Sequence, residues 1–241
     1  MGFFYLKSRL SRLAGRLPAL RTKRGRRSLF AQRAKLDNLF QPHVDTVEDR
    51  YPELFSALAQ WLGGGSETAV LSFGCATGEE VFTLRRYLPD ARLRGLDINR
   101  WNVAECRRRR RRRGDQRMSF AVAGTAGAEL PGSYDAVLAM AVFRHGSLGG
   151  GQHPAHCDHL ISFEAFERTV GGLVKALRPG GYLLIEHANF RFTDTVYAGD
   201  FEVVSSRTRL DLQLKSTPLY GRDNQLLPVA TEVDVAFRKR L

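Results

Sequence analysis

The sequence predicts an α/β fold built on a mostly parallel sheet, with a C-terminal antiparallel hairpin strand. Short apolar runs of strand character alternate with helical patterns between residues 69 and 186. This alternation is typical of βαβ units with right-handed crossovers. After residue 187 the helical patterns stop, and residues 201–215 and 229–238 have strand character on either side of a turn-forming segment. That change favours an antiparallel pair that closes one edge of the sheet.

The expected elements follow one another regularly. An apolar stripe over residues 51–62 predicts a helix before the first strand, and the glycines that follow end it. Strands are expected at residues 69–73, 92–96, 118–122, 136–140 and 182–186, and helices at residues 79–88, 101–113 and 163–177. A chain of 241 residues is long enough to bury one such core with appendages.

The turn after the first strand, residues 74–80, has the features of a small-ligand cradle. Gly74 and Gly78 allow a sharp turn and a close approach of a ligand to the backbone. Glu79 and Glu80 stand at the start of the next helix, where phosphate-binding folds place an anion. Two carboxylates there would repel a phosphate group, so the turn favours a cationic ligand.

The wording of this turn, Gly-Cys-Ala-Thr-Gly-Glu-Glu, resembles motif I of the class I S-adenosylmethionine-dependent methyltransferases. It is especially similar to the Gly-Cys-Ser-Thr-Gly-Glu-Glu of the chemotaxis receptor methyltransferases. The resemblance continues in order through the strand that ends in Asp97, through residues 130–140 and through residues 177–186. Asp97 follows Gly78 by 19 residues, about the spacing at which dinucleotide folds place a ribose-binding acid. The four motifs imply the Rossmann-like sheet of this family over roughly half of the chain.

The resemblance implies S-adenosyl-L-methionine as the cofactor. Glu79 would face the ammonium group of the cofactor, and Asp97 would accept both ribose hydroxyls, because one carboxylate has two oxygens for two vicinal donors. Ile98 would cover the face of the adenine ring, Thr125 would contact its edge, and Met140 would lie near the methyl group that is transferred. The implied cofactor-binding residues are Gly74, Cys75, Ala76, Thr77, Gly78, Glu79, Asp97, Ile98, Thr125 and Met140.

The acceptor side carries no motif that identifies a substrate. The fourth strand runs into Met-Ala-Val-Phe-Arg-His at residues 140–145, which is neither the Asn/Asp-Pro-Pro-aromatic motif of adenine or glutamine N-methyltransferases nor the Pro-Cys pair of cytosine C5 enzymes. Strand order places this segment at the carboxyl-end crevice of the sheet. His145 is the candidate catalytic base, because imidazole titrates near neutral pH. Glu186 and His187 are expected at the same crevice, and a structural role for His145 stays open.

The sequence therefore predicts a methyltransferase that acts on an oxygen or nitrogen of a small molecule. Three alternatives stay open: methylation of a protein glutamate, methylation of nucleic acid through basic segments, and cofactor binding without catalysis. Against the first, the chemotaxis enzymes carry a helical N-terminal domain longer than the roughly 45 residues before the core here. The domains expected are a basic arm at residues 1–45 and a methyltransferase domain at residues 46–241.

Two segments carry most of the net charge of +12: residues 1–36 contain 11 Lys or Arg and no acid, and residues 107–113 are all arginine. Within the first segment, residues 1–20 have the pattern of a basic amphipathic helix. Both are candidates to contact an anionic membrane surface or a polyanion. For residues 1–36 the competing interpretation is an arm that folds back on the domain, and this arm also resembles a transit peptide. For residues 107–113 the competing interpretation is a solvated helix end.

Cysteine usage and hydropathy favour a cytoplasmic protein. The basic arm adds the possibility that this protein binds peripherally to a membrane surface. Cys75, Cys106 and Cys157 are single cysteines with no disulfide framework, which is typical of a reducing compartment. No apolar stretch approaches the ~18 residues of a membrane span. The segment 153–160 holds three histidines and Cys157, but a substrate-capping loop is preferred over a zinc site, so no metal is predicted.

Overall fold

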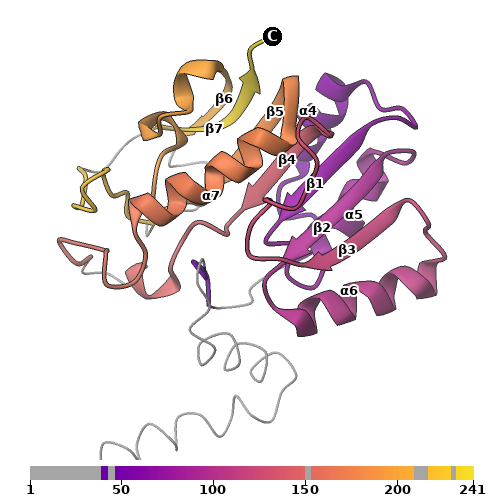
Figure 1. The fold of residues 1–241 in the computed structure, drawn as a ribbon, viewed down its shortest axis with the longest axis horizontal. Helices are drawn as coiled ribbons and strands as arrows, with labels where there is room; N and C mark the ends of the chain where they lie inside the picture. Colours follow the sequence, from indigo (N-terminus) through magenta and orange to yellow (C-terminus); the bar gives the residue numbers. More distant parts are fainter. Residues whose placement is uncertain (1–38, 43–46, 150–152, 209–216, 229–231) are drawn as a thin grey trace, which may run out of the picture.

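The computed structural model describes residues 39–42, 47–149, 153–208, 217–228 and 232–241. These residues form one seven-stranded sheet with strand order β3-β2-β1-β4-β5-β7-β6 (Figure 1). The strands are β1 (Ala69–Phe73), β2 (Arg92–Asp97), β3 (Met118–Val122), β4 (Tyr134–Met140), β5 (Leu177–Glu186), β6 (Phe201–Thr208) and β7 (Glu232–Lys239). β1 to β5 pair in parallel, and β7 is antiparallel to both β5 and β6. The predicted fold class is confirmed.

Four helices of the described chain pack on this sheet: α4 (Pro52–Leu62), α5 (Glu79–Tyr87), α6 (Arg100–Arg113) and α7 (Phe163–Ala176). Side chains along a strand alternate between the two faces. In β4, Val137 joins the core cluster that contains α7, whereas Leu138 joins the cluster that contains residues of α4, α5 and α6. The sheet is therefore buried on both faces, which explains why its central strands are apolar throughout.

Several element boundaries differ from the sequence-based expectation. β5 begins at Leu177, five residues before the expected start, because Leu177 already pairs with Tyr134 ahead of a bulge in the register. The Pro-Gly-Gly segment 179–181, which precedes the expected strand, is part of β5. α7 correspondingly ends at Ala176. Residues 1–38, which hold most of the predicted arm, and residues 209–216 lie outside the described structure.

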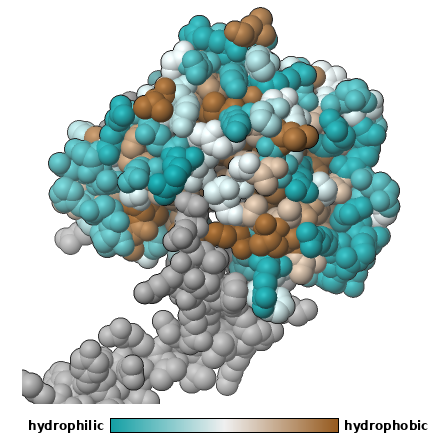
Figure 2. Space-filling model, in the orientation of Figure 1, coloured by the Kyte–Doolittle hydropathy of each residue, from teal (hydrophilic) through white to brown (hydrophobic). Residues whose placement is uncertain are grey.

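The surface of the described chain is mostly polar. Figure 2 shows hydrophilic residues over both flanks of one face, with hydrophobic and intermediate residues gathered between them. Within the described residues, no helix combines the length and the apolar character that crossing a membrane requires.

Candidate functional site

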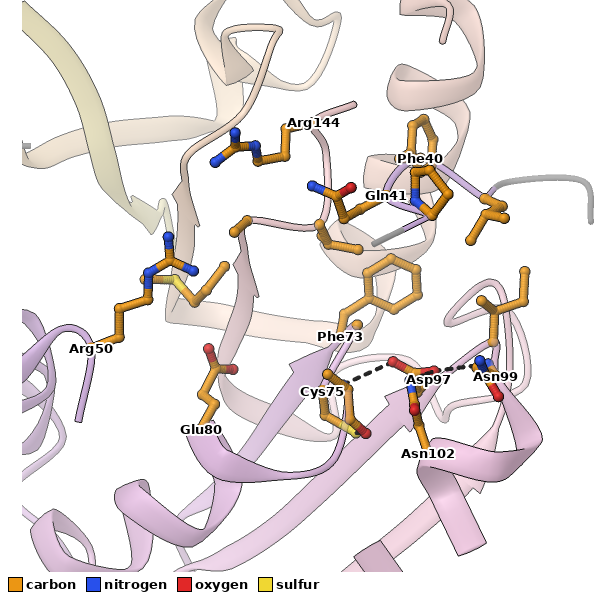
Figure 3. A pocket seen from close by; sticks show the side chains of 18 of the residues that line it. Phe40, Gln41, Arg50, Phe73, Cys75, Glu80, Asp97, Asn99, Asn102 and Arg144 are labelled. Atoms are coloured by element: carbon orange, nitrogen blue, oxygen red, sulfur yellow. Dashed lines mark hydrogen bonds between the residues drawn. The ribbon is translucent and has the colours of Figure 1, made fainter. Parts of the chain in front are cut away.

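A cavity of about 580 Å³ opens where the carboxyl ends of β1, β2 and β4 meet. Figure 3 shows the side chains of 18 of the residues that line it. Six of the predicted cofactor-binding residues are among the lining residues: Gly74, Cys75, Ala76, Asp97, Ile98 and Met140. Residues 39–42, which the sequence analysis assigns to the end of the arm, line another part of the wall.

The turn between β1 and α5 is fixed by packing and by hydrogen bonds to the neighbouring strand. Gly74 has a φ of 73°, and a Cβ there would lie 2.5 Å from Cγ2 of Val142. The amide groups of Gly74 and Cys75 both donate to the carbonyl of Leu96, at 2.8 and 2.9 Å. Glycine is thus required at position 74, and the turn is held against the end of β2.

Asp97 links this turn to the next one. Its carboxylate accepts hydrogen bonds from the amide of Ala76 (2.8 Å), the amide of Asn99 (2.8 Å) and Nδ2 of Asn102 (3.1 Å). Burial raises the pKa of the Asp97 carboxyl to about 6. A carboxylate has about four acceptor positions, so roughly one stays available after these three bonds.

Asn102, on α6, is a site residue that the sequence analysis missed. It lines the cavity, and its Oδ1 is buried without a hydrogen-bond partner in the described part of the chain. This oxygen and the remaining acceptor position of Asp97 are two neighbouring hydrogen-bond acceptors. A ribose diol, which has two hydroxyl donors, needs that number. In the sequence, Asn102 is only an amide side chain five residues after Asp97. Such side chains are too common for this spacing alone to predict a binding residue.

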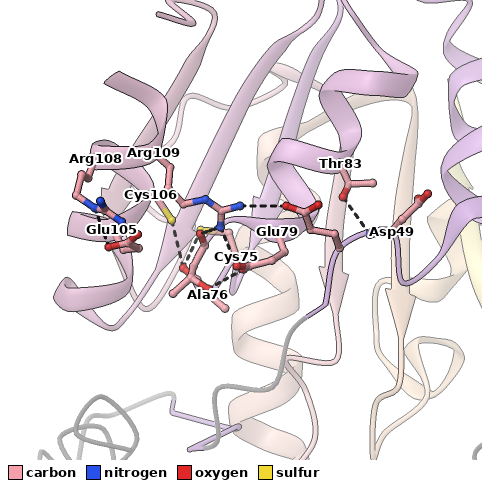
Figure 4. A network of polar contacts seen from close by, with 11 residues as sticks. Asp49, Cys75, Ala76, Glu79, Thr83, Glu105, Cys106, Arg108 and Arg109 are labelled. Carbon is pink, nitrogen blue, oxygen red and sulfur yellow. Dashed lines mark hydrogen bonds and ion pairs between the residues drawn. The ribbon is translucent and has the colours of Figure 1, made fainter. Parts of the chain in front are cut away.

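Glu79 and Glu80 lie in different surroundings. Glu79 pairs with Nη1 of Arg109 at 2.7 Å and accepts a hydrogen bond from Thr77 (Figure 4). It is not among the residues that line the cavity, whereas Glu80 is. Burial raises the pKa of the Glu80 carboxyl to about 7. Consecutive helical residues point about 100° apart, so only one of the two glutamates faces the cavity.

The arginine run completes α6 and makes many contacts within the chain. Arg109 also donates to the carbonyl of Thr77 and stacks over the ring of Phe82. Arg107 donates two hydrogen bonds to the carbonyl of Phe120, and Arg110 donates to the carbonyl of Asp115. Arg111 and Arg112 are exposed. The contacts favour the helix-end interpretation, while contact with a polyanion stays a prediction.

Tyr51 brings a polar pair to another part of the cavity wall. Its hydroxyl lies 2.9 Å from Nδ1 of His187, and Nε2 of that histidine lies 3.7 Å from Oε1 of Glu186. Tyr51 lines the cavity, while His187 and Glu186 lie behind it with little exposed side-chain surface. Burial raises the pKa of the Tyr51 hydroxyl. The pairing joins residues 136 positions apart, a distance that sequence patterns do not bridge.

Four other predicted residues do not line the cavity: Thr77, Gly78, Thr125 and His145. Gly78 has a φ of 90°, and a Cβ there would lie 2.8 Å from the Phe82 ring, so its role in the turn is steric. Thr125 Oγ1 accepts from the amide of Gly127 at 3.4 Å. Nδ1 of His145 accepts from the amide of Ser147 at 3.3 Å, at the start of a short 3₁₀ turn.

The histidine-rich segment 153–160 shows ordinary structural contacts. Nδ1 of His153 lies 2.7 Å from the carbonyl of Leu148, and Cys157 is buried in the core. Where the chain is described, no three His, Cys, Asp or Glu side chains are grouped in a way that could hold a metal ion.

The strand order, the glycine turn and the acid at the end of β2 define a Rossmann-like domain with a cavity at the carboxyl ends of its strands. A family model described as a methyltransferase domain matches residues 65–224, about two thirds of the chain. The chain belongs to this family of S-adenosylmethionine-dependent methyltransferases. The buried acceptors of Asp97 and Asn102 fit the nucleoside of that cofactor. A comparison with curated proteins finds no match.

Solved structures match the chain at low identity. The (4+2)-cyclase SpnF is 14% identical with a TM-score of 0.51, over 78% of this chain and 81% of that one. The YcgJ protein from Bacillus subtilis is 11% identical with a TM-score of 0.48, over 79% of this chain and 100% of that one. Phosphoethanolamine N-methyltransferase 2 from Haemonchus contortus is 19% identical with a TM-score of 0.42. That match covers 59% of this chain but only 29% of the Haemonchus protein.

Proposed function

We propose that the protein transfers a methyl group from S-adenosylmethionine to an oxygen or nitrogen of a small molecule. The observation that carries the proposal is the single cavity that joins the β1 turn, Asp97 and the end of β4. In this arrangement, the proposed nucleoside site and the space for the methyl acceptor lie in the same cavity. The volume of about 580 Å³ lies within the range of small-molecule and cofactor sites.

Different residues of the cavity bind different parts of the cofactor. Asp97 and Asn102 accept the ribose hydroxyls, and the amide of Ala76, bonded to Asp97, keeps that carboxylate in place. Glu80 faces the cationic end of the cofactor; Glu79, the residue expected from the sequence, neutralises Arg109 instead. When bound, S-adenosylmethionine would supply a methyl carbon for in-line attack by a nucleophile, and the carbon–sulfur bond would break to leave a neutral thioether. The cavity's task is to hold the acceptor on that line, close to Met140.

A protonated acceptor must lose its proton as the new bond to carbon forms. His145 is the base that the sequence predicts, and it stays a prediction, since its imidazole does not line the cavity. Tyr51 is the competing group, because this residue lines the cavity and its hydroxyl, 2.9 Å from Nδ1 of His187, can pass a proton to that nitrogen. The two candidates make opposite predictions for substitutions at positions 145 and 51.

Calorimetric titration with S-adenosylhomocysteine tests the cofactor site, and incubation with radiolabelled S-adenosylmethionine and cell extract tests the transfer. Label recovered in small molecules supports the proposal. Label recovered only in protein or nucleic acid would replace it with one of the two macromolecular alternatives. Tight cofactor binding with no transfer would favour a non-methylating role, which the fold permits because a protein described as a cyclase shares it.

A further inference from the structure

Arg144 is a cation on the cavity wall that the cofactor-binding residues leave unused. It follows β4, and in Figure 3 it lies above the cavity beside Gln41, with Asp97 and Glu80 lower in the view. Its Nε is buried and has no hydrogen-bond partner within the described residues. No carboxylate of the described chain lies within ion-pair distance of it. A buried guanidinium donor without an acceptor is costly, which indicates that a ligand supplies the acceptor.

A second arginine adds positive charge to the same cavity. Arg50 lines the wall and lies over the ring of Tyr51, 5.6 Å from its centroid. Burial, together with the charge of Arg50, lowers the pKa of the Arg144 guanidinium. Asp49 also lines the cavity, but it pairs with Arg86 at 3.2 Å and accepts a hydrogen bond from Tyr87.

The cofactor accounts for only one of these two cations. Its amino-acid end carries an ammonium and a carboxylate on the same carbon, so it needs an acid and a cation close together. Glu80 and Arg50 are drawn on the same side of the cavity in Figure 3 and fit this pair. Arg144 then stays available for the acceptor.

The wall beside Arg144 is largely apolar. Phe40, Pro42 and Val142 line the cavity, and the Phe40 ring packs edge-on against Phe143 with centroids 5.1 Å apart. An acceptor bound there would place an apolar body against this wall and a charged group against the guanidinium. On this basis, which rests on the proposed function, we propose that Arg144 binds an oxyanion, a carboxylate or a phosphate, of the methyl acceptor.

The experiment titrates the protein saturated with S-adenosylhomocysteine with three probes of similar shape: benzoate, phenyl phosphate and neutral benzamide. We expect the wild-type protein to bind an anion at least tenfold more tightly than benzamide, and the preferred anion identifies the group. Arg144→Gln should lose that preference, with a fall of about 10- to 100-fold for the anion, the usual weight of a charge-assisted hydrogen bond. Arg111→Gln, an exposed arginine of α6, is the matched control and should bind like wild type.

Cofactor fragments separate the roles of the two arginines. Arg50→Gln should weaken S-adenosylhomocysteine but not 5′-methylthioadenosine, which lacks the amino-acid end, and Arg144→Gln should weaken neither by more than about twofold. Equal binding of anion and benzamide by wild type, or an unchanged anion preference in Arg144→Gln, would overturn the proposal. Loss of S-adenosylhomocysteine affinity in Arg144→Gln would overturn it too, by assigning Arg144 to the cofactor. Failure of the proposed function would instead appear as absent cofactor binding by wild type, and the anion titration can be repeated without cofactor.

Discussion

Replacing Glu80 with glutamine is the most direct test of how the cofactor's cationic end is held. Glu80 lines the cavity and its carboxyl pKa is raised to about 7 by burial, while its neighbour Glu79 is paired with Arg109 outside the cavity. If Glu80 binds the ammonium group, Glu80→Gln should weaken S-adenosylhomocysteine by about 10- to 100-fold at pH 8, since it removes one charged hydrogen bond. Glu79→Gln, the matched control, should weaken it by less than about threefold.

The raised pKa also gives a pH dependence with a definite sign. A bound ammonium favours the ionised carboxylate, so binding requires Glu80 to lose its proton whenever the pH is below its free-protein value of about 7. At pH 6 only about a tenth of Glu80 would be ionised, and affinity should be roughly tenfold below its plateau above pH 8. Asp97, whose carboxyl pKa is about 6, steepens the loss at lower pH.

Calorimetry between pH 5.5 and 8.5 measures both effects. The Glu80→Gln variant should lose the step near pH 7 and retain only the decline at lower pH. 5′-Methylthioadenosine should show only the decline at lower pH, with no step near pH 7 in either protein, because it has a ribose but no ammonium group. Wild-type affinity in Glu80→Gln at pH 8 would refute the reasoning, and a loss confined to Glu79→Gln would restore the sequence-based assignment.

Three further predictions concern the ribose site, the base and the arm. Asp97→Ala should weaken both S-adenosylmethionine and S-adenosylhomocysteine by about 1–3 kcal/mol in calorimetry, because the ribose loses a buried charged acceptor. If His145 is the base, His145→Ala and His145→Gln should each slow turnover by about 10²–10⁴-fold with cofactor affinity unchanged. Deleting residues 1–36 should leave the fold and cofactor affinity nearly intact and remove most binding to anionic vesicles, at about 1 kcal/mol per basic residue lost.

Each of these three has an outcome that contradicts it. Unchanged cofactor affinity in Asp97→Ala would show that the ribose lies elsewhere; Asp234→Asn, on β7, controls for an unspecific effect. Wild-type turnover in His145→Gln would transfer the base role to another group, and a slow Tyr51→Phe would identify it. A truncated chain that cannot fold would show that the arm is part of the core.

The fold was predictable because its signals are local. Apolar runs, the glycine turn at Gly74 and the end of the second strand at Asp97 lie within short stretches, and each is found in the structure where its local pattern predicts it. Ribose binding by Asp97 stays a prediction. The start of β5 was misplaced because pairing with β4 overrides the turn preference of the Pro-Gly-Gly segment 179–181. Tertiary pairing decides such boundaries, and sequence patterns do not report it.

The site was only partly predictable, since its remaining parts depend on side-chain direction and long-range pairing. Glu79 and Glu80 are chemically identical neighbours, and only their positions on the helix separate them. Tyr51 reaches His187 across 136 residues. Arg144 was within the segment expected at the crevice, but its significance depends on the buried Nε that only the structure reveals.

The contact between Arg107 and β3 has a consequence for solubility. β3 is the last strand on its side of the sheet, and an edge strand presents unpaired carbonyl and amide groups that another chain can join. The guanidinium of Arg107 occupies the outward carbonyl of Phe120 with two donors. Arg110 and Arg111 lie with Arg107 around the same hollow beside Phe120, so a second copy that approached this edge would meet a blocked acceptor and positive charge. We therefore expect the contact between Arg107 and Phe120 to disfavour strand-to-strand aggregation at this edge.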